Sequence, residues 1–325
     1  MSIQKLNVLI VDDLHPAFFE LISSDLFNIT YLPRIQSADI GSALNDQDIL
    51  ILRSKVYVDA DLCSLANRLK LVVRAGSGLD NLDTKWLSEN DILFFNTAES
   101  NAQAVAEQTL GMLLNLMANI GKADREIRNG TWNREANRGD ELEGKTVGIV
   151  GFGHTGSRFA KLLSGFGVQI LAYDKYKSGF GYAGVKEADM NEIFSEADIV
   201  SLHIPLTEET VNMVNSHYIN QFSKPLRLLN LSRGRIVNIE HIIEAIETKK
   251  IMGFGADVLP NERLSNLNAK ELKELDQLRA FANVLLTPHI GGWTHQSYEK
   301  ISINLAKKLH EYYPIGLEKI KPINV

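Results

Sequence analysis

The sequence contains a single cysteine, Cys63, so no disulfide can form within the chain. A lone thiol is typical of proteins from a reducing compartment and predicts a cytoplasmic location. No run of about 18 apolar residues occurs, so we expect neither a transmembrane helix nor a membrane partner. The first residues, MSIQKLNV, lack the apolar core of a signal peptide, and no secretory leader is expected.

Positive charge is also scarce, because 34 lysines and arginines face 40 aspartates and glutamates and leave a net charge of −6 at pH 7. No basic tail offsets this balance, so nucleic acid is not expected as the main partner. The chain has 325 residues, of which 45% are hydrophobic and 23% charged. These values are ordinary for a globular protein and leave room for roughly two domains, each with its own core.

The most informative stretch covers residues 145–174. An apolar strand at 147–150 is followed by Gly151, Gly153 and Gly156 in the spacing G-x-G-x-x-G and then by an amphipathic helix. In such a unit the first glycine allows a tight turn and the second lets a pyrophosphate approach the backbone. The third lets helix and strand pack closely. The pyrophosphate would meet the free N–H groups of the helix start. The stretch therefore predicts a dinucleotide site.

The choice of dinucleotide depends on Asp174, which ends the next apolar strand, over 168–173. An acid at the end of this strand, about 20 residues after the glycines, binds the ribose hydroxyls. A carboxylate there also repels a 2′-phosphate, so the sequence predicts NAD rather than NADP. Lys175 and Lys177 follow closely and reduce this preference.

Short apolar strands alternate with helices along both halves of the chain. They are expected near 7–11, 28–32, 49–53, 70–74 and 92–96, and again near 198–202, 226–230, 252–256 and 284–287. Helices are expected near 102–120, 189–195, 215–221, 239–248, 269–279 and 294–313. This alternation predicts an α/β protein with two doubly wound parallel sheets. The apolar spacing of 102–120 fits a core helix and a subunit interface equally well.

The first strand ends at Asp12 and Asp13, an arrangement that resembles the start of a bacterial receiver domain. A receiver domain also needs a phosphorylated aspartate at a later strand end. Here that strand ends in Arg53, Ser54 and Lys55, which excludes a receiver domain. The next strand ends in Arg74, beside a glycine corner at Gly76 and Ser77 that could donate N–H groups. The first half of the chain therefore predicts an anion site at these strand ends.

The second half places three further groups after predicted strands, namely Arg233, His289 and an acidic pair of Asp257 and Glu262. Removal of a hydride from a hydroxyl carbon also releases a proton, which an imidazole can accept at neutral pH. A carboxylate behind the imidazole stabilises its protonated form, and an arginine binds a substrate carboxylate through two parallel donors. Alone, each of these residues fits an exposed or structural role as well.

Together, the motifs resemble those of the D-isomer-specific 2-hydroxyacid dehydrogenase family over essentially the whole chain. The motifs that carry the resemblance are RAGSGLDNLD at 74–83, VAE at 105–107, EGKTVGIVGFG at 143–153, HIPLTEET at 203–210, NLSRGRIVN at 230–238 and TPHIGG at 287–292. The resemblance implies catalytic roles for Arg233, Glu262 and His289. It implies that NAD contacts come from Gly151, Gly153, His154, Thr155, Gly156, Asp174, His203, Ile204, Pro205, Leu231, Ser232, Asp257, Gly291 and Gly292. No metal site is implied.

The resemblance also implies a domain organisation and a partner. A discontinuous, flavodoxin-like catalytic domain would comprise residues 1–98 and 294–325, and a Rossmann NAD-binding domain would comprise 99–293. The family forms homodimers through the region of the 99–129 helix. The tail after residue 314 is too short for the serine-binding regulatory domain of the longer family members, so we expect no such domain.

Within the family the resemblance is strongest to members that oxidise D-3-phosphoglycerate to 3-phosphohydroxypyruvate, the first step towards serine. The positions expected to bind the phosphate and carboxylate are Arg53, Ser54, Arg74, Gly76, Ser77 and Arg134. A phosphorylated acid needs several cations, which these arginines supply. Another small D-2-hydroxy acid, such as a substrate related to glyoxylate, hydroxypyruvate or lactate, is the alternative. An NAD(H)-sensing corepressor is a further alternative, because corepressors of this family keep the catalytic residues.

The sequence departs from the family pattern at several positions. Glu262 is followed by Arg263 where proline is common, and the segment 263–282 is long. His154 and Thr155 replace the usual basic–aliphatic pair in the glycine loop. Trp293 stands where a small residue is common, at the expected cleft.

Overall fold

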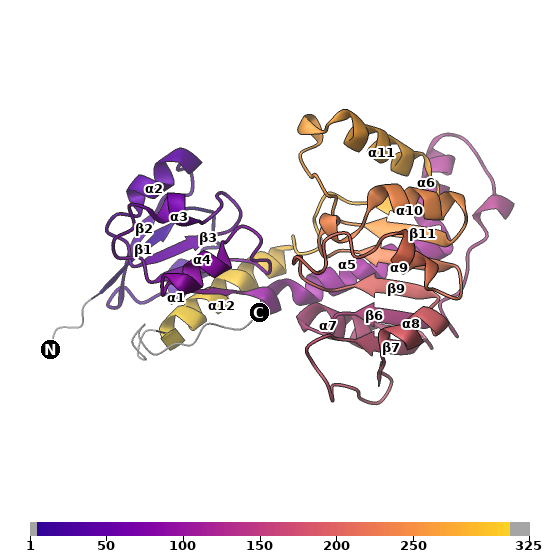
Figure 1. Ribbon diagram of the computed structural model, residues 1–325, viewed down its shortest axis with the longest axis horizontal. Helices are drawn as coiled ribbons and strands as arrows, with labels where there is room; N and C mark the ends of the chain where they lie inside the picture. Colours follow the sequence, from indigo (N-terminus) through magenta and orange to yellow (C-terminus); the bar gives the residue numbers. More distant parts are fainter. Residues whose placement is uncertain (1–4, 313–325) are drawn as a thin grey trace. The chain divides into compact units, whose positions relative to one another are not determined.

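The computed structural model describes residues 5–312, so the prediction about the tail after residue 314 falls outside the described residues. The chain divides into two compact units (Figure 1). Unit 1 comprises Met1–Asn101 and Trp293–Val325, and unit 2 comprises Ala102–Gly292. Between residues 5 and 312, no helix is long and apolar enough to cross a membrane.

Unit 1 is built on a five-stranded parallel sheet with the order β2-β1-β3-β4-β5, the flavodoxin-like order. Its strands are β1 (Leu6–Ile10), β2 (Phe27–Tyr31), β3 (Ile49–Leu52), β4 (Leu71–Arg74) and β5 (Leu93–Asn96). Its helices are α1 (Ala17–Leu21), α2 (Ile40–Ala43), α3 (Ala60–Cys63), α4 (Thr84–Glu89) and α12 (His295–Tyr312).

Two apolar layers cover the two faces of this sheet. On one face α12 packs beside α1 and contributes Ile301, Leu305 and Leu309 to a core shared with the first strands. The other face is covered by a second cluster that includes Leu44 from after α2 and Leu87 of α4. The last described helix of the chain therefore completes a core that the first residues begin.

Unit 2 is built on a seven-stranded parallel sheet with the order β12-β11-β10-β9-β6-β7-β8. Its strands are β6 (Thr146–Val150), β7 (Gln169–Tyr173), β8 (Lys186–Glu187), β9 (Ile199–Leu202), β10 (Leu226–Asn230), β11 (Ile251–Ala256) and β12 (Val284–Leu286). Its helices are α6 (Ile120–Arg128), α7 (His154–Leu163), α8 (Met190–Glu196), α9 (Ser216–Asn220), α10 (Ile239–Glu247), α11 (Ala269–Ala280) and most of α5 (Ala98–Ala118).

The helices of unit 2 lie on both faces of its sheet. Buried residues of α5 and α7 form one apolar layer, and buried residues of α8, α9 and α10 form the other. The strand order reverses between β6 and β9, which is the topological switch point where such sheets bind ligands beyond the carboxyl ends of their strands. The prediction of two doubly wound parallel sheets is confirmed, and each predicted strand matches an observed strand to within one residue at either end.

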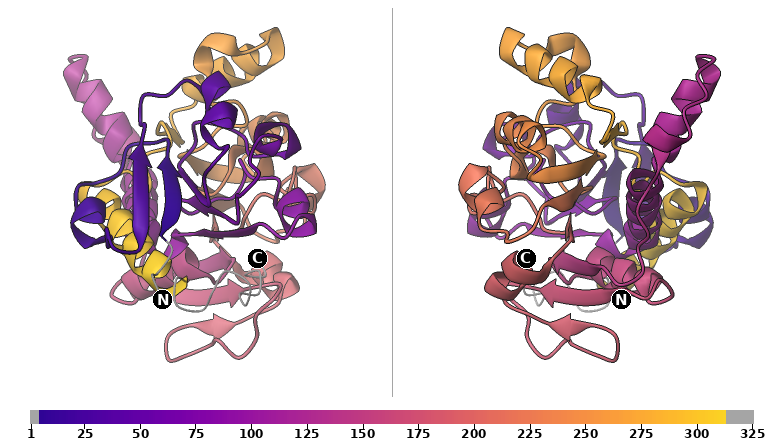
Figure 2. Two further views of the ribbon diagram at one scale, coloured as in Figure 1. Left: turned by 90° about the vertical axis from the view of Figure 1, so that its left-hand side faces the viewer. Right: turned by 90° about the vertical axis from the view of Figure 1, so that its right-hand side faces the viewer.

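The prediction of one helix over 102–120 is wrong at its end. α5 stops at Ala118, and Asn119 adopts a left-handed backbone with φ of 55°. Asparagine tolerates this conformation, which an α-helix cannot continue through. The chain then starts α6, which the sequence did not predict and which contains no buried residue. Figure 2 shows α6, in magenta, projecting from its unit.

Candidate functional site

The glycine loop joins β6 to α7 in unit 2. Gly151 has φ of +95°, and a Cβ there would overlap the carbonyl oxygen of His203. A Cβ at Gly156 would overlap the carbonyl oxygen of Gly151. Both positions therefore exclude any larger residue, and each brings two segments of backbone into contact.

Gly153 differs from the other two glycines. A Cβ there would meet no described atom within 4 Å beyond its own chain neighbours, so the backbone at Gly153 faces open space. Gly153 is also the N-cap of α7, and no described side chain caps this helix start. The first N–H groups of α7, from His154, Thr155 and the residues that follow, can therefore meet a phosphate group. This open backbone at a helix start fits the pyrophosphate of a dinucleotide.

Asp174 follows β7 and ties the glycine loop to it. Its carboxylate accepts hydrogen bonds from the backbone N of Phe152 at 2.9 Å, Tyr176 at 3.0 Å and Lys177 at 3.1 Å. The Lys177 ammonium donates to the carbonyl of Phe152 at 3.3 Å. The acid predicted to bind ribose is thus held in place at the carboxyl edge of the sheet, next to the glycines.

His203, Ile204 and Pro205 follow β9, the strand across the switch point from β6. The imidazole Nε2 of His203 lies 2.9 Å from the hydroxyl of fully buried Ser201, and burial lowers the imidazole pKa to about 3. His203 is therefore neutral at physiological pH. Its carbonyl oxygen and the Ile204 side chain lie against Gly151. The ring itself packs against Phe159 of α7, with ring centroids 5.5 Å apart, so its role here is structural.

Leu231, Ser232 and Arg233 follow β10. Leu231 is buried, and the Ser232 hydroxyl donates to the carbonyl of Leu202 at 2.7 Å. Asn230, which is fully buried, donates from Nδ2 to the carbonyl of Arg233 at 2.9 Å. The Arg233 guanidinium donates to the carbonyl of Ser232 at 2.7 Å. A buried amide, which the sequence analysis did not single out, therefore sets the conformation from which Arg233 extends.

Asp257 follows β11, and only 1% of its surface is exposed. One carboxylate oxygen accepts from Gln108 Nε2 at 2.9 Å, the Thr287 hydroxyl at 2.5 Å and the backbone N of Ile290 at 2.9 Å. The other oxygen accepts from the backbone N of Gly291 at 2.7 Å. Predicted as a cofactor contact, Asp257 here fixes the loop after β12, which carries His289.

Two donors to the Asp257 carboxylate, Gln108 and Thr287, were not singled out by the sequence analysis. Gln108 lies on α5, far from Asp257 along the chain, and its amide donates both to Asp257 and to the Thr287 hydroxyl, the latter at 3.0 Å. Gln108 is one of several polar residues of α5 and carries no signal of its own, whereas Thr287 lies within the TPHIGG motif. A buried carboxylate needs such donors, since it is costly when left unpaired.

His289 lies on this loop with a left-handed backbone, φ of 55°, and its N–H donates to the carbonyl of Asp257 at 2.7 Å. Its Nδ1 lies 2.9 Å from a carboxylate oxygen of Glu262, and both side chains are 46% exposed. When Nδ1 carries the proton towards Glu262, Nε2 is left as the acceptor on the other side of the ring. This geometry is that of an imidazole base oriented by a carboxylate.

The long segment after Glu262 contains α11, whose first turn holds the Glu262 loop. Asn268 caps α11 in a capping box with Glu271. The Glu271 carboxylate also accepts from Asn261 Nδ2 at 3.2 Å, and Asn261 in turn accepts from the backbone N of Arg263 at 3.1 Å. The departure at Arg263 and the added length therefore place Glu262 beside His289.

In unit 1 the anion-site candidates lie at the carboxyl ends of β3 and β4. Arg74 Nε donates to the carbonyl of Arg53 at 3.1 Å, and the Arg74 guanidinium folds over the space that a Cβ at Gly76 would fill. The Ser77 hydroxyl accepts from Asn101 Nδ2 at 3.2 Å, and Ser54 is exposed. Arg53 and Arg74 are therefore brought together by contacts within unit 1.

Arg134 lies in unit 2, on the exposed segment after α6, where its carbonyl accepts from the backbone N of Asn137 at 3.2 Å. Arg53 and Arg74 belong to unit 1, so the folding of one unit alone does not bring Arg134 to them.

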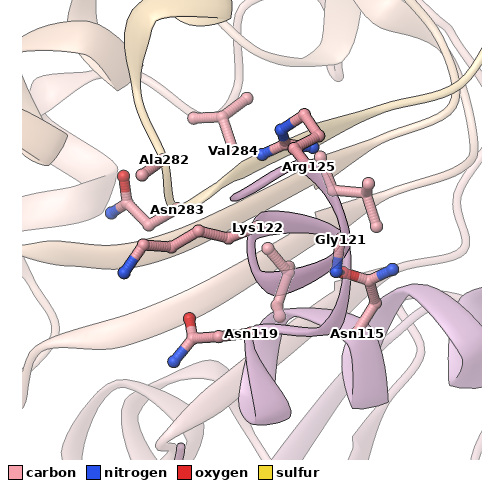
Figure 3. A pocket seen from close by; sticks show the side chains of 10 residues that line it. Asn115, Asn119, Gly121, Lys122, Arg125, Ala282, Asn283 and Val284 are labelled. Carbon is pink, nitrogen blue, oxygen red and sulfur yellow. The ribbon is translucent and has the colours of Figure 1, made fainter. Parts of the chain in front are cut away.

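A separate pocket lies where α5 gives way to α6 beside the start of β12 (Figure 3). It is lined by Asn115, Leu116, Asn119, Gly121, Lys122, Arg125, Ala282, Asn283, Val284 and Leu285. Residues 282–285 lead into β12 from its amino end, whereas the predicted site residues follow the carboxyl ends of the strands. This pocket contains none of the predicted site residues.

Fold and site together define an α/β protein with a dinucleotide site in unit 2. The sequence profile of the D-isomer specific 2-hydroxyacid dehydrogenase, NAD binding domain, matches residues 110–291. The chain is 33% identical over 275 residues to hydroxypyruvate reductase of Thermotoga maritima, covering 85% of this chain and 88% of that protein. The chain therefore belongs to the D-isomer-specific 2-hydroxyacid dehydrogenase family, and its cofactor is NAD, as predicted.

Two further similarities bear on the substrate and the fold. The chain is 32% identical over 314 residues to D-3-phosphoglycerate dehydrogenase of Synechocystis sp., covering 93% of this chain and 55% of that protein. It thus spans about half the length of that relative. Among solved structures, D-lactate dehydrogenase from Aquifex aeolicus, complexed with NAD and lactic acid, superposes with a TM-score of 0.81 over 97% of both chains at 24% identity. This likeness establishes a shared fold.

Proposed function

We propose that the protein is an NAD-dependent dehydrogenase that oxidises D-3-phosphoglycerate to 3-phosphohydroxypyruvate. The observation that carries the proposal is the contact of 2.9 Å between His289 Nδ1 and the Glu262 carboxylate at the carboxyl edge of a dinucleotide-binding sheet. Hydride removal from a hydroxyl carbon needs a group that takes the hydroxyl proton, and a neutral imidazole held by a carboxylate meets that need.

Each catalytic residue has a separate task in this proposal. His289 accepts the hydroxyl proton at Nε2, and Glu262 stabilises the imidazolium that forms and keeps the ring oriented. Arg233 binds the substrate carboxylate through its guanidinium, whose conformation Asn230 sets from below. NAD, when bound along the glycine loop, supplies the acceptor for the hydride. Asp257 keeps the His289 loop in place through three hydrogen bonds to its carboxylate, from Thr287, Ile290 and Gly291.

The substrate assignment depends on charge. Arg53 and Arg74 lie together in unit 1, and two cations suit a phosphate better than the hydroxyl of glycerate. We assign Arg134 to the same anionic substrate from its place in the sequence. A hydroxypyruvate reductase is the second candidate, since a relative of that name matches this chain over most of both lengths.

Removal of the substrate arginines gives the test. Arg53→Ala and Arg134→Ala should each raise the KM for 3-phosphoglycerate by about tenfold or more, because a charge-assisted hydrogen bond is worth roughly 1.5–3 kcal/mol. The KM for glycerate should change less. Steady-state assays with 3-phosphoglycerate, glycerate, glyoxylate, hydroxypyruvate, pyruvate and lactate measure both.

Arg138→Ala is the matched control, since Arg138 lies on the same exposed segment as Arg134 and pairs with Glu135. Its kinetics should equal those of the unchanged protein. The phosphate assignment fails when 3-phosphoglycerate is no better a substrate than glycerate. Tight NADH binding without turnover of any acid would instead favour a sensing protein.

We also propose that the protein forms a homodimer through α6 and the segment that follows it. α6 has no buried residue, Ile120 and Ile127 are more than half-exposed, and Trp132 is 85% exposed. Exposed apolar side chains of this kind suit an interface.

Sedimentation equilibrium tests the dimer. The unchanged protein should give twice the mass of one chain, and an Ile127→Glu/Trp132→Glu variant should give the mass of a single chain. An unchanged dimer in that variant would contradict the assignment of the interface to α6 and the segment after it.

A further inference from the structure

Arg53 lies against two aromatic rings of its own unit. Its guanidinium carbon is 4.5 Å from the ring centroid of Trp293 and 5.6 Å from that of Tyr298. Both distances are within the range of a cation–π interaction. Among residues 5–312 no carboxylate forms an ion pair with this guanidinium, and the two aromatic rings lie against it.

The acids nearest to Arg53 are engaged elsewhere. Asp12 accepts from the backbone N of Arg53 at 2.6 Å and from that of Lys55 at 3.4 Å. Asp13 accepts from the hydroxyl of Tyr31 at 3.2 Å. Burial lowers the pKa of the Arg53 guanidinium, although the charges of both acids oppose this effect. The loop around Arg53 is thus fixed through its backbone, while its guanidinium lies against the two aromatic rings.

The two rings are positioned by the start of α12. The Thr294 hydroxyl accepts from the backbone N of Ser297 at 3.0 Å, and the Thr294 carbonyl accepts from that of Tyr298, also at 3.0 Å. The ring of His15 packs edge-on against Tyr298 at 5.5 Å. Trp293, by contrast, is 65% exposed and belongs to no apolar core. A tryptophan held at this position is therefore not explained by packing of the unit.

We propose that Trp293 and Tyr298 form an aromatic platform that holds Arg53 by the face of its guanidinium and presents the N–H edge to the anionic group of the substrate. This inference rests on the proposed role of Arg53 in substrate binding. A ring that contacts the face of a guanidinium uses none of its five N–H donors. The platform therefore fixes the direction of the donors and leaves them all for an anion. Trp293 and Tyr298 are positioning residues in this scheme, because they act through Arg53.

Steady-state kinetics of Trp293 variants provide the first test, with 3-phosphoglycerate or with whichever acid of the panel is turned over best. Trp293→Leu removes the aromatic face but keeps an apolar side chain, and should raise KM by between about two- and thirtyfold. The kcat should stay within about twofold. Trp293→Phe, which keeps a weaker aromatic face, should recover part of the loss, and the dissociation constant of NADH should not change.

A double-mutant cycle separates this role from a general effect on folding. In an Arg53→Gln background, Trp293→Leu should raise KM no further, because there is no cation left to orient. An equal effect of Trp293→Leu with and without Arg53 would overturn the proposal, as would an unchanged KM in the single variant. Tyr57→Leu is the matched control, since Tyr57 is an exposed aromatic side chain of the same unit.

Fluorescence provides a second readout that does not need turnover. The chain has three tryptophans, so a Trp86→Phe/Trp132→Phe variant reports on Trp293 alone. Titration with inorganic phosphate and with 3-phosphoglycerate should change its emission saturably, and Arg53→Gln should abolish the change. A titratable emission without turnover of any acid would leave the platform in place and reject the proposed function. Normal turnover with a silent Trp293 and an unchanged KM would reject the platform alone.

Discussion

Replacement of His289 by asparagine is expected to lower kcat by about 10²–10⁴-fold, the usual contribution of a general acid–base group. Asparagine is chosen because it also tolerates the left-handed backbone that this position requires. The protein should fold as before, since the loop is held by the backbone N–H groups of residues 289–291 and not by the imidazole. Stopped-flow and steady-state assays of NADH formation measure the loss.

Glu262→Gln tests the second member of the pair. An amide keeps a hydrogen bond to Nδ1 but does not stabilise a protonated ring, so the loss in kcat should be smaller than for His289. Steady-state assays of both variants, run side by side, measure the difference in kcat. His203 cannot replace His289 as the source of a positive charge, because burial lowers its pKa to about 3 and keeps it neutral.

Two controls accompany this pair. His217→Asn and Glu247→Gln change exposed residues of unit 2 and should leave kcat unchanged. NADH should bind all four variants with similar affinity. Near-normal turnover by His289→Asn would remove His289 from the mechanism.

Two alanine substitutions in the glycine loop should have different effects. Gly153→Ala should weaken NADH binding, and Gly156→Ala should lower the stability of the fold. Gly153→Ala adds a Cβ where no described atom lies within 4 Å, so the free energy of unfolding should change by no more than about 0.5 kcal/mol. The methyl group would occupy the space that a pyrophosphate needs, and NADH affinity should fall by about tenfold or more.

Gly156→Ala places its Cβ onto the carbonyl oxygen of Gly151, so β6 and α7 must move apart. Overpacking of this kind costs about 1–3 kcal/mol or more, and the melting temperature of the protein should fall. Thermal unfolding and fluorescence titration with NADH measure both quantities. The assignment of the loop fails if Gly153→Ala binds NADH as tightly as the unchanged protein.

The order and type of the strands followed from local patterns. Each predicted strand is a short apolar run, and parallel strands buried on both faces need such runs. The edge strand β8, which consists of exposed Lys186 and Glu187, has no such signal and was not predicted. The helix break at Asn119 was not predictable in the same way, because the apolar pattern of α5 continues through it. Asparagine tolerates a left-handed backbone, but few asparagines adopt one, so the residue type alone did not locate the break.

The sequence predicted the site residues that follow strand ends, but not the residues that hold them in place. Arg233, Asp257 and His289 follow neighbouring strands, so their grouping could be expected from topology. Gln108 could not be singled out, since it donates to Asp257 and Thr287, which only the fold brings near. Asn230 and Asn261 act on nearby residues, but polar residues in loops are too common for the sequence to mark these two. The partnership of Arg53 with Trp293 joins residues from opposite ends of the chain, and no pattern of spacing connects them.

The position of α12 has a consequence for the order in which the protein is made. Unit 2 lies within the sequence of unit 1, between Asn101 and Trp293. During translation, all the strands of unit 1 emerge early, but Ile301, Leu305 and Leu309, which cover one face of its sheet, leave the ribosome only after the whole of unit 2. Domains generally fold as units, so unit 2 can fold before α12 is made. Until then, one apolar face of the unit 1 sheet stays exposed to solvent.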